Sequence, residues 1–438
     1  MNITVIGAGY VGLITGACLA DIGMNVICMD KNKATINNLN KLELPIYEPG
    51  LEDLIKKNCL VNKLHFTTST KKAIENSTAI FICVGTPSLK DGSVNLKYIY
   101  QAAKEIANYI NSYKLIIIKS TVPVGTCQRV KSFINDIMKN TKKSIEFDIV
   151  SNPEFLREGT AINDFNFPDR IVIGTDSQRA TMIMKDIYNA PIFQDTPFIF
   201  TKIETSEMIK YASNAFLATK ISYINEIANI CELCGADISV VAYAMGLDKR
   251  IGDKFLNPGP GFGGSCFPKD TKALIKIGED LGYKPNIIKS VMNSNLLQRK
   301  RAVQKIINVI GEVKEKTFTL LGLAFKPNTA DIRESASIYI IEELLKNGGI
   351  IKAFDPKAMD SMKNSYPELA IKYCDDELSA CEGSDCIIFA TDWKQFRDID
   401  FTVIKGIVNN PVIIDLRNMF EPSYIKNNGF LYKGIGRE

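Results

Sequence analysis

The chain has 438 residues, which is too long for one hydrophobic core and indicates two or three domains. Its hydrophobic content of 46% and charged content of 23% are ordinary for a globular protein, and no apolar run approaches the ~18 residues of a membrane span. The formal net charge of +4 is spread without a dense Lys/Arg block, which gives nucleic-acid binding little support and weakly favours an anionic substrate.

The cysteines and the single histidine indicate the cellular compartment and exclude some kinds of active site. The eleven cysteines form no regular framework, so we expect free thiols in a reducing compartment and a cytoplasmic protein. Met1 leads straight into a strand-like segment, which leaves no room for a signal peptide. The one histidine, His65, excludes a multi-histidine metal site, and we expect no metal. Its polar surroundings favour a surface residue over a member of a Ser-His-Asp triad.

The N-terminal segment predicts a dinucleotide-binding unit. A buried strand from Asn2 to Ile6 leads into Gly-x-Gly-x-x-Gly at residues 7–12, an apolar helix, and a second strand that ends at Asp30. Glycines permit the tight turn and the approach of a pyrophosphate to the helix N-terminus, and the acid accepts ribose hydroxyls. A carboxylate there favours NAD over NADP, because it would repel a 2′-phosphate. The residues that carry this pattern are Gly7, Gly9, Gly12 and Asp30.

Three further strands are predicted before residue 150, and each ends in a polar turn. Ligands of open α/β sheets bind at the carboxyl ends of strands, where Thr86, Thr121 and Glu154 stand. Either threonine is equally consistent with a helix cap or a satisfied turn. Glu154 and Glu158 would share a face if their segment is helical. The expected strands are Ala79–Val84, Leu115–Ile118 and Phe147–Val150.

A helical pattern of some thirty residues runs from about Ile203 to Cys234 and closes at Gly235, a favourable C-cap. At ~1.5 Å per residue, such a helix spans roughly 45 Å, enough to connect two domains. Lys210 and Asn214 are four residues apart and share one face, which is typical of a cleft lining but also of a solvated helix edge.

The segment from Arg250 to Asp270 contains five glycines and three prolines, which predicts a loop of fixed shape that approaches a ligand closely. Cys266 stands at its end, where Pro268 and the following apolar spacing predict the start of a helix. A helix N-terminus and the neighbouring Lys269 favour a thiolate, so we predict a nucleophilic cysteine. The alternative is a small buried hydrophobe, which most free cysteines are.

A second alternation of strands and helices follows residue 316 and predicts another parallel-sheet domain. Lys326 and Arg333 lie near the end of its first strand, where they would bind phosphates or remain exposed charges. The expected fold class is α/β, with two Rossmann-like doubly wound parallel-sheet domains joined by a central helical domain with one long helix. The predicted domain boundaries are 1–200, 201–300 and 301–438, and the expected C-terminal strands are Phe318–Leu323, Ile350–Phe354, Cys386–Ala390 and Val412–Leu416.

Five motifs, in order along nearly the whole chain, make the sequence similar to the UDP-glucose/GDP-mannose dehydrogenase family. They are Lys-Ser-Thr-Val-Pro-Val-Gly at 119–125, Asn-Pro-Glu-Phe-Leu-Arg-Glu at 152–158, Lys-Tyr-Ala-Ser-Asn at 210–214, Gly-Gly-Ser-Cys-Phe-Pro-Lys-Asp at 263–270 and Gly-Leu-Ala-Phe-Lys-Pro at 322–327. Residues 246–252 and 255–259 look most like the branch that oxidises UDP-glucose.

The resemblance implies oxidation of a sugar C6 alcohol to a carboxylate with two NAD⁺, an N-terminal Rossmann domain, a central helical domain that makes a homodimer contact, and a C-terminal UDP-binding domain. It implies Cys266 as nucleophile, Lys210 and Asn214 at the reacting oxygen, Asp270 and Thr121 for protons and water, and Glu154 as base. The implied NAD contacts are Gly7, Gly9, Tyr10, Val11, Gly12, Asp30, Lys31, Thr86, Thr121, Glu158, Lys269 and Arg333. The implied substrate contacts are Glu154, Phe155, Leu156, Arg157, Glu158, Lys210, Asn214, Arg250 (reaching a neighbouring subunit's substrate), Phe255, Leu256, Asn257, Pro258, Gly259, Gly263, Phe325 and Lys326.

Three other functions remain open at this point. One is oxidation of another nucleotide sugar, such as GDP-mannose or a UDP-N-acetylhexosamine. A second is a two-electron dehydrogenase of the 6-phosphogluconate or hydroxyacid type, which needs no cysteine. The third is a non-catalytic nucleotide sensor, which has no use for a thiol at a helix start.

Overall fold

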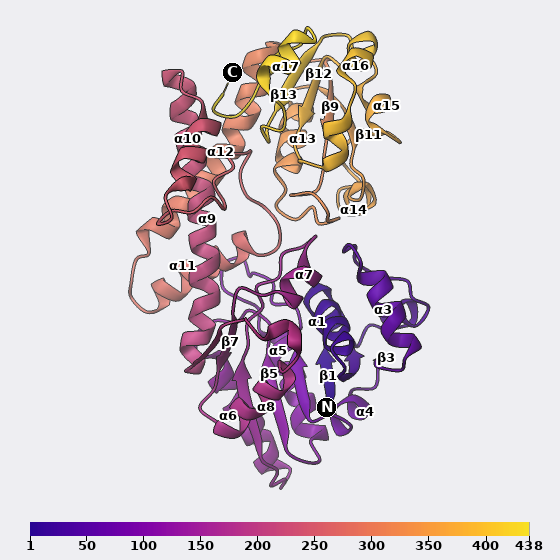
Figure 1. The fold of residues 1–438 in the computed structure, drawn as a ribbon, viewed down its shortest axis with the longest axis vertical. Helices are drawn as coiled ribbons and strands as arrows, with labels where there is room; N and C mark the ends of the chain where they lie inside the picture. Colours follow the sequence, from indigo (N-terminus) through magenta and orange to yellow (C-terminus); the bar gives the residue numbers. More distant parts are fainter. Residues whose placement is uncertain (438) are drawn as a thin grey trace. The chain divides into compact units, whose positions relative to one another are not determined.

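A computed structural model describes residues 1–437, which form two compact units. Unit 1 comprises residues 1–213 and 276–281, and unit 2 comprises residues 214–275 and 282–438. The boundary falls inside the longest helix, α9 (Ile203–Cys234), whose limits agree with the sequence prediction (Figure 1). No helix among residues 1–437 is long and apolar enough to cross a membrane.

Unit 1 is built on a sheet whose strands follow the order β3-β2-β1-β4-β5-β6-β7-β8. All neighbours are parallel except β6 and β7, which pair antiparallel through Ser151 and Gly174. The first six positions have the strand order of dinucleotide-binding sheets. The strands are β1 (Asn2–Ile6), β2 (Asn25–Met29), β3 (Leu64–Thr67), β4 (Ala79–Ile82), β5 (Lys114–Ile118), β6 (Phe147–Ser151), β7 (Ile171–Gly174) and β8 (Phe198–Thr201).

Helices cover both faces of this sheet, because its central strands are apolar on both sides. In β5, Leu115 and Ile117 belong to one buried cluster, while Ile116 and Ile118 belong to another. The helices are α1 (Tyr10–Asp21), α2 (Lys33–Asn40), α3 (Leu51–Leu60), α4 (Thr70–Glu75), α5 (Lys97–Tyr109), α6 (Thr126–Asn140), α7 (Ala161–Asn166), α8 (Gln178–Ile187) and the short 3₁₀ helix Pro191–Phe193. The first cluster includes α1, α3, α7 and α8, and the second includes α4, α5 and α6.

Unit 2 begins with helices and continues into a second sheet with the order β11-β10-β9-β12-β13-β14, all parallel. No bounds were predicted from the sequence for α12, which lies before the sheet. The helices besides α9 are α10 (Ile238–Leu247), α11 (Phe267–Asp280, whose last turn belongs to unit 1), α12 (Asn286–Ile310), α13 (Ala336–Lys346), α14 (Met359–Ser365), α15 (Glu377–Cys381), α16 (Phe401–Ile407), α17 (Pro422–Asn427) and the 3₁₀ helix Lys394–Asp398. The strands are β9 (Thr317–Leu321), β10 (Ile350–Phe354), β11 (Ile371–Tyr373), β12 (Cys386–Phe389), β13 (Val412–Asp415) and β14 (Leu431–Lys433).

The α/β fold class with two doubly wound sheets and an intervening helical region is confirmed. The condition under which Glu154 and Glu158 would share a face is not met. Residues 152–160 are not helical, so Glu154 and Glu158 do not share a helix face. The Glu154 carboxylate accepts a hydrogen bond from the Leu156 amide instead, and this local contact closes a turn in place of a helix.

Candidate active site

The turn between β1 and α1 has the geometry expected of a pyrophosphate-binding loop. Gly7 has a φ of +103°, and a Cβ atom on Gly12 would lie 1.8 Å from the Gly7 carbonyl oxygen, so the fold itself requires both glycines. A Cβ atom on Gly9 would meet no protein atom within 4 Å. Space therefore exists at Gly9 for a ligand to approach the N-terminus of α1, where free amides favour an anion.

Asp30 follows β2 and is held against this turn. One carboxylate oxygen accepts a hydrogen bond from the Ala8 amide at 2.9 Å, and the other accepts one from the Asn32 amide at 2.9 Å. The carboxylate is thus fixed beside the glycine turn, which fits an acceptor for ribose hydroxyls. Its neighbour Lys31 pairs with Glu105 at 2.9 Å.

The ends of β4 and β5 are joined by their threonines. The Thr86 hydroxyl donates to the Thr121 carbonyl oxygen at 3.0 Å, and both residues are buried. The same hydrogen bond is what a turn-forming threonine would make, so this contact leaves both interpretations of Thr86 open.

Glu154 forms a buried ion pair with Lys210. The carboxylate lies 3.1 Å from the Lys210 Nζ atom, and the two side chains are 7% and 4% exposed. Burial alone would raise the pKa of Glu154, but Lys210, the Leu156 amide and Lys119 outweigh it and lower that pKa. The Lys210 ammonium also lies 5.3 Å from the centre of the Phe155 ring, whose face is covered by Arg170 at 3.6 Å. In unit 1, the structure thus holds a buried carboxylate and a buried cation together.

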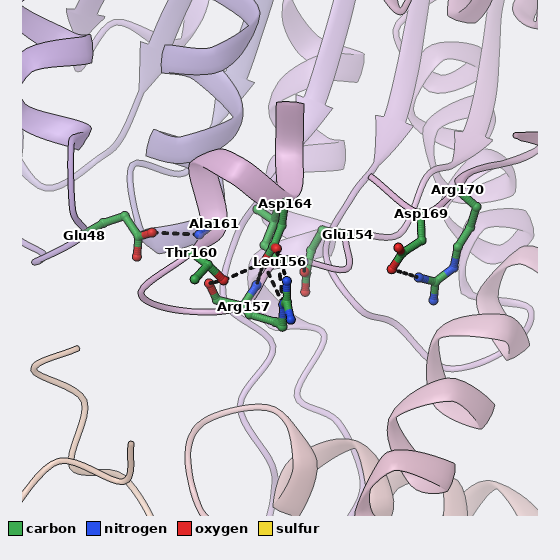
Figure 2. A network of polar contacts seen from close by, with 9 residues as sticks. All are labelled: Glu48, Glu154, Leu156, Arg157, Thr160, Ala161, Asp164, Asp169 and Arg170. Carbon is green, nitrogen blue, oxygen red and sulfur yellow. Dashed lines mark hydrogen bonds and ion pairs between the residues drawn. The ribbon is translucent and has the colours of Figure 1, made fainter. Parts of the chain in front are cut away.

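The segment that follows Glu154 is held by a second carboxylate, Asp164 (Figure 2). Asp164 accepts hydrogen bonds from the Arg157 amide at 2.8 Å and from the Thr160 hydroxyl at 3.1 Å. It also pairs with the Arg157 guanidinium at 2.5 Å. Residues 154–160 are therefore fixed as an irregular segment that leads into α7.

A polar cavity of about 250 Å³ in unit 1 is lined by Glu154 and the segment that follows it. At the same cavity, Lys119 donates to the Asn152 side-chain oxygen at 3.3 Å, and the Tyr188 hydroxyl donates to that oxygen at 2.8 Å. The Asn152 amide in turn donates to the Val172 carbonyl oxygen. The ends of β5 and β6 thus present polar groups to one cavity.

In unit 2, the glycine-rich loop is anchored by amide side chains of α9 and α12. Asn225 accepts from the Gly259 amide at 2.8 Å, and Gln298 donates to the Gly259 carbonyl oxygen at 2.9 Å. Asn295 makes two hydrogen bonds with the backbone of Phe262, at 2.7 and 3.0 Å. These paired contacts fix the shape of the loop, as its glycine and proline content predicted.

Cys266 immediately precedes α11, and its carbonyl oxygen accepts the Asp270 amide at 2.8 Å, so the predicted helix start is correct. Its thiol is partly exposed and lies 3.5 Å from the Ser265 hydroxyl. Asp270 is 1% exposed. Its carboxylate accepts the Asn214 amide at 2.6 Å and pairs with Lys269 at 2.5 Å. The structure thus links Asn214, Asp270 and Lys269 into one polar chain at the start of α11.

The loop also packs against the segment between β9 and α13. A Cβ atom on Gly263 would lie 2.2 Å from the Glu334 carbonyl oxygen, and the Gly264 amide donates to the Arg333 carbonyl oxygen at 2.8 Å. The Arg333 side chain pairs with Asp331 at 2.6 Å, while Lys326 lies 5.5 Å from the centre of the Phe325 ring. The backbone at residues 263–264 therefore lies beside the backbone at residues 333–334.

Arg250 lies outside these contacts. Its guanidinium is bonded to Asp248 at 2.6 to 3.1 Å, and its side chain is 89% exposed. Leu256 is buried, and Phe255 has a positive φ of 64°, which is unusual for a residue that is not glycine. The first part of the loop is thus partly exposed and conformationally constrained.

Sequence reasoning missed three residues that organise these contacts. Arg417 donates from its Nε atom to the Ala390 carbonyl oxygen and from Nη2 to that of Phe325, and lies against Gly259. A signal existed, because Arg417 directly follows a predicted strand end. The other two are Glu334, which pairs with Lys272 and Arg299, and Glu48, which is buried and far in sequence from its partners. Neither position follows a recognisable pattern.

Comparison with known proteins agrees with the architecture. Models of the UDP-glucose/GDP-mannose dehydrogenase family match the chain in three parts: the NAD binding domain at residues 1–192, the central domain at 204–296 and the UDP binding domain at 319–422. The chain is 47% identical to the UDP-glucose 6-dehydrogenase TuaD of Bacillus subtilis, over 100% of this chain and 93% of that protein. It is 42% identical to the UDP-glucose 6-dehydrogenase of Rhizobium meliloti, over 100% of both chains.

A solved structure extends the agreement to three dimensions. A UDP-glucose dehydrogenase from Pyrobaculum islandicum superposes with a TM-score of 0.91 at 36% identity and covers 100% of this chain and 98% of its own. The sequence identities over the full length and the three matched domains lead to one conclusion. The chain is a member of the UDP-glucose/GDP-mannose dehydrogenase family.

Proposed function

We propose that this protein oxidises the C6 alcohol of UDP-glucose to a carboxylate, yielding UDP-glucuronate, with two equivalents of NAD⁺. The observation that carries the proposal is the partly exposed Cys266 thiol at the start of α11, in a family whose members pair an NAD binding domain with a UDP binding domain. The full-length similarity to UDP-glucose 6-dehydrogenases favours UDP-glucose as the sugar nucleotide.

The thiol answers a specific chemical problem. Loss of a hydride and a proton from the alcohol gives an aldehyde, which offers no second hydride until a nucleophile adds to it. Addition of the Cys266 thiolate forms a C–S bond and a thiohemiacetal, and loss of a second hydride converts this to a thioester. Water then attacks the carbonyl carbon and the C–S bond breaks, which releases the carboxylate, the thiolate and two protons. Amide groups at the N-terminus of α11 favour that thiolate.

Lys210 and Asn214 are assigned to the reacting oxygen. An ammonium and an amide N–H stabilise the negative charge that develops on this oxygen in each step. One N–H of the Asn214 amide is bonded to Asp270, and an amide carries two, so the second remains for substrate. Glu154 is assigned as the base that deprotonates water, with Asp270 and Thr121 organising protons and water.

The residues of unit 1 fit NAD, which supplies a hydride acceptor when bound. The open space at Gly9 and the amides of α1 suit a pyrophosphate, while the Asp30 carboxylate suits ribose hydroxyls and opposes a 2′-phosphate. In unit 2, residues 255–259, Gly263 and Lys326 are assigned to the nucleotide sugar. A lysine ammonium is suited to a diphosphate.

Product stoichiometry tests this function. With limiting UDP-glucose, we expect two NADH per sugar and UDP-glucuronate as the product; one NADH per sugar would indicate a two-electron dehydrogenase and refute the double oxidation. We expect Cys266→Ser to lose nearly all formation of free uronate, because an alkoxide is a poorer leaving group than a thiolate. Undiminished turnover of this variant would refute the nucleophile assignment. Comparison of kcat/KM for GDP-mannose and UDP-N-acetylhexosamines would select another nucleotide sugar if UDP-glucose were the weaker substrate.

A homodimer is proposed as the working form, and the cytoplasm as its place, which suits the free cysteines of the chain. Large apolar side chains are exposed on one face of α9 at seven-residue spacing, and others lie on one face of α10. We expect Tyr243→Lys to shift the mass in solution toward the monomer, while Leu60→Lys in unit 1 leaves it unchanged. A dimer that withstands Tyr243→Lys would count against this face. The exposed residues are Phe216, Tyr223 and Ile230 on α9 and Val240, Tyr243 and Leu247 on α10.

A further inference from the structure

Glu48 is a buried carboxylate that belongs to none of the predicted site residues. It lies in the loop before α3, is 5% exposed and has three hydrogen-bond donors around it. One oxygen accepts the Tyr10 hydroxyl at 2.5 Å and the Gly159 amide at 2.6 Å. The other accepts the Ala161 amide at 2.7 Å, a contact drawn in Figure 2. A single side chain therefore joins segments that are more than a hundred residues apart in the sequence.

Both of the segments that Glu48 joins belong to the proposed cofactor site. Tyr10 is the first residue of α1, directly after Gly9, where the helix amides face the pyrophosphate. Gly159 directly follows Glu158, which the family resemblance implies as a contact of both NAD and the substrate. Glu48 thus fixes the residue after Glu158 against the start of α1.

Asp164 supports the same part of the segment 154–160, because its contacts alternate along the chain with those of Glu48. It accepts the Arg157 amide and the Thr160 hydroxyl and pairs with the Arg157 guanidinium, and its side chain is 7% exposed. Glu154, at the start of the segment, is fixed separately by Lys210 and by the Leu156 amide. Glu154 and Arg157, two of the proposed substrate contacts, therefore keep their supports when Glu48 is altered. Figure 2 shows Glu48 and Asp164 on either side of the Thr160–Ala161 step.

We infer that Glu48 is a positioning residue for NAD, because it fixes the residue after Glu158 against the start of α1. The inference rests on the proposed function, which assigns the amides of α1 to the NAD pyrophosphate. It adds that a buried carboxylate outside the proposed NAD contacts sets the affinity for the cofactor.

A glutamine at position 48 is a sharp probe because it keeps the shape and changes only the hydrogen-bonding capacity. Both oxygens of the carboxylate accept hydrogen bonds, whereas a carboxamide has one oxygen that accepts and one NH₂ group that donates. In either orientation, its NH₂ group would face a backbone N–H, of Gly159 or of Ala161, and that amide would lose its partner.

The experiment measures two affinities in each purified full-length variant: NADH by fluorescence titration and UDP-glucose by calorimetry. For Glu48→Gln, we expect the Kd for NADH to rise about tenfold and that for UDP-glucose to stay within about twofold, as the loss of one buried hydrogen bond implies. Glu52→Gln removes an exposed carboxylate paired with Lys56 on α3, and serves as the matched control that changes neither affinity.

Two results would overturn the inference: unchanged NADH affinity in Glu48→Gln, or an equal loss of both affinities in the same variant. If Glu48→Gln fails to fold, Glu48→Asp keeps the carboxylate but shortens the side chain, which lengthens its contacts with Gly159 and Ala161, and about a threefold rise in the Kd for NADH is expected. No rise in that variant would likewise overturn the inference. Failure of the unaltered protein to bind NADH would instead refute the proposed function, so the two failures are distinguishable.

Discussion

The buried ion pair with Lys210 keeps the Glu154 carboxylate ionised in unit 1. In the ligand-free protein, the pKa of Glu154 lies below its ordinary value of 4.5, because Lys210 and the Leu156 amide outweigh burial. A carboxylate held this way is ionised at neutral pH but is a weak base. If the Lys210 ammonium turns toward a substrate oxyanion, the largest effect that lowers the pKa of Glu154 weakens, which raises its basicity. This is what a base for the hydrolytic step requires.

The same pair predicts a pH-dependent contribution to stability. Because the pKa of Glu154 is lower in the folded than in the unfolded chain, its contribution is fully present above about pH 4.5 and is lost as the pH falls through the folded pKa. We expect Glu154→Gln to lower the free energy of unfolding at pH 7 by about 3 kcal/mol, since the buried Lys210 loses its counter-charge. Denaturant unfolding at several pH values should show the difference from the unaltered protein shrinking below pH 4.5.

A surface pair provides the control for this measurement. Glu52→Gln breaks an exposed ion pair with Lys56, which is expected to change stability by less than about 1 kcal/mol at any of these pH values. A stability difference for Glu154→Gln that stays constant between pH 7 and pH 3 would contradict the assigned charge of Glu154.

At the scale of single elements, two glycines of the β1–α1 turn have different roles: the fold requires Gly12, and the proposed ligand requires Gly9. A methyl group on Gly12 would clash with the Gly7 carbonyl oxygen at 1.8 Å, whereas one on Gly9 would meet no protein atom within 4 Å. We expect Gly12→Ala to lose several degrees of melting temperature or fail to fold. Gly9→Ala should melt within about 2 °C of the unaltered protein, yet bind NADH at least about tenfold more weakly. Unchanged NADH binding by Gly9→Ala would remove Gly9 from the cofactor site.

The elements that the sequence predicts well are those with a strong periodic signal. The limits of α9 follow from an uninterrupted helical pattern that closes at Gly235, and the buried strands β1 and β10 follow from short apolar runs. The strands β11 and β14 were missed because each has three residues and alternates in exposure, so their pairing in the sheet defines them more than their own composition.

The site is less predictable than the fold because its contacts join distant residues. Motifs identified Cys266 and Glu154 as candidates, and the helix start after Cys266 followed from Pro268. In contrast, the bond between Glu48 and Gly159 spans 111 positions, and no local pattern reveals it. The local hydrogen bond from the Leu156 amide to Glu154 also overrides the helical spacing of Glu154 and Glu158.

For the whole molecule, the most informative feature is that the two sheets begin with the same strand order. In each, a glycine turn follows the first strand, and an aspartate follows the second: Asp30 after β2 and Asp355 after β10. Their environments differ. Asp30 is partly exposed and accepts from the Ala8 and Asn32 amides. Asp355 is fully buried, and its oxygens are occupied by donors from the turn, from the start of the next segment and from the indole of Trp393. The shared topology therefore places Asp30 and Asp355 at corresponding positions. Of the two, Asp30 is the partly exposed one that a ligand can reach.

This difference predicts which aspartate controls cofactor choice. Asp30→Ser removes the carboxylate that would repel a 2′-phosphate and retains a short polar side chain, so we expect the ratio of kcat/KM for NADP⁺ to that for NAD⁺ to rise at least about tenfold. Asp355→Asn occupies the corresponding position in the other sheet and is the matched control. Because Asp355 binds only protein donors, its loss should lower the melting temperature and leave that ratio within about twofold. Steady-state rates with both cofactors measure the two ratios. A shift in Asp355→Asn equal to that in Asp30→Ser would mean that general loosening, and not the charge at Asp30, sets the preference.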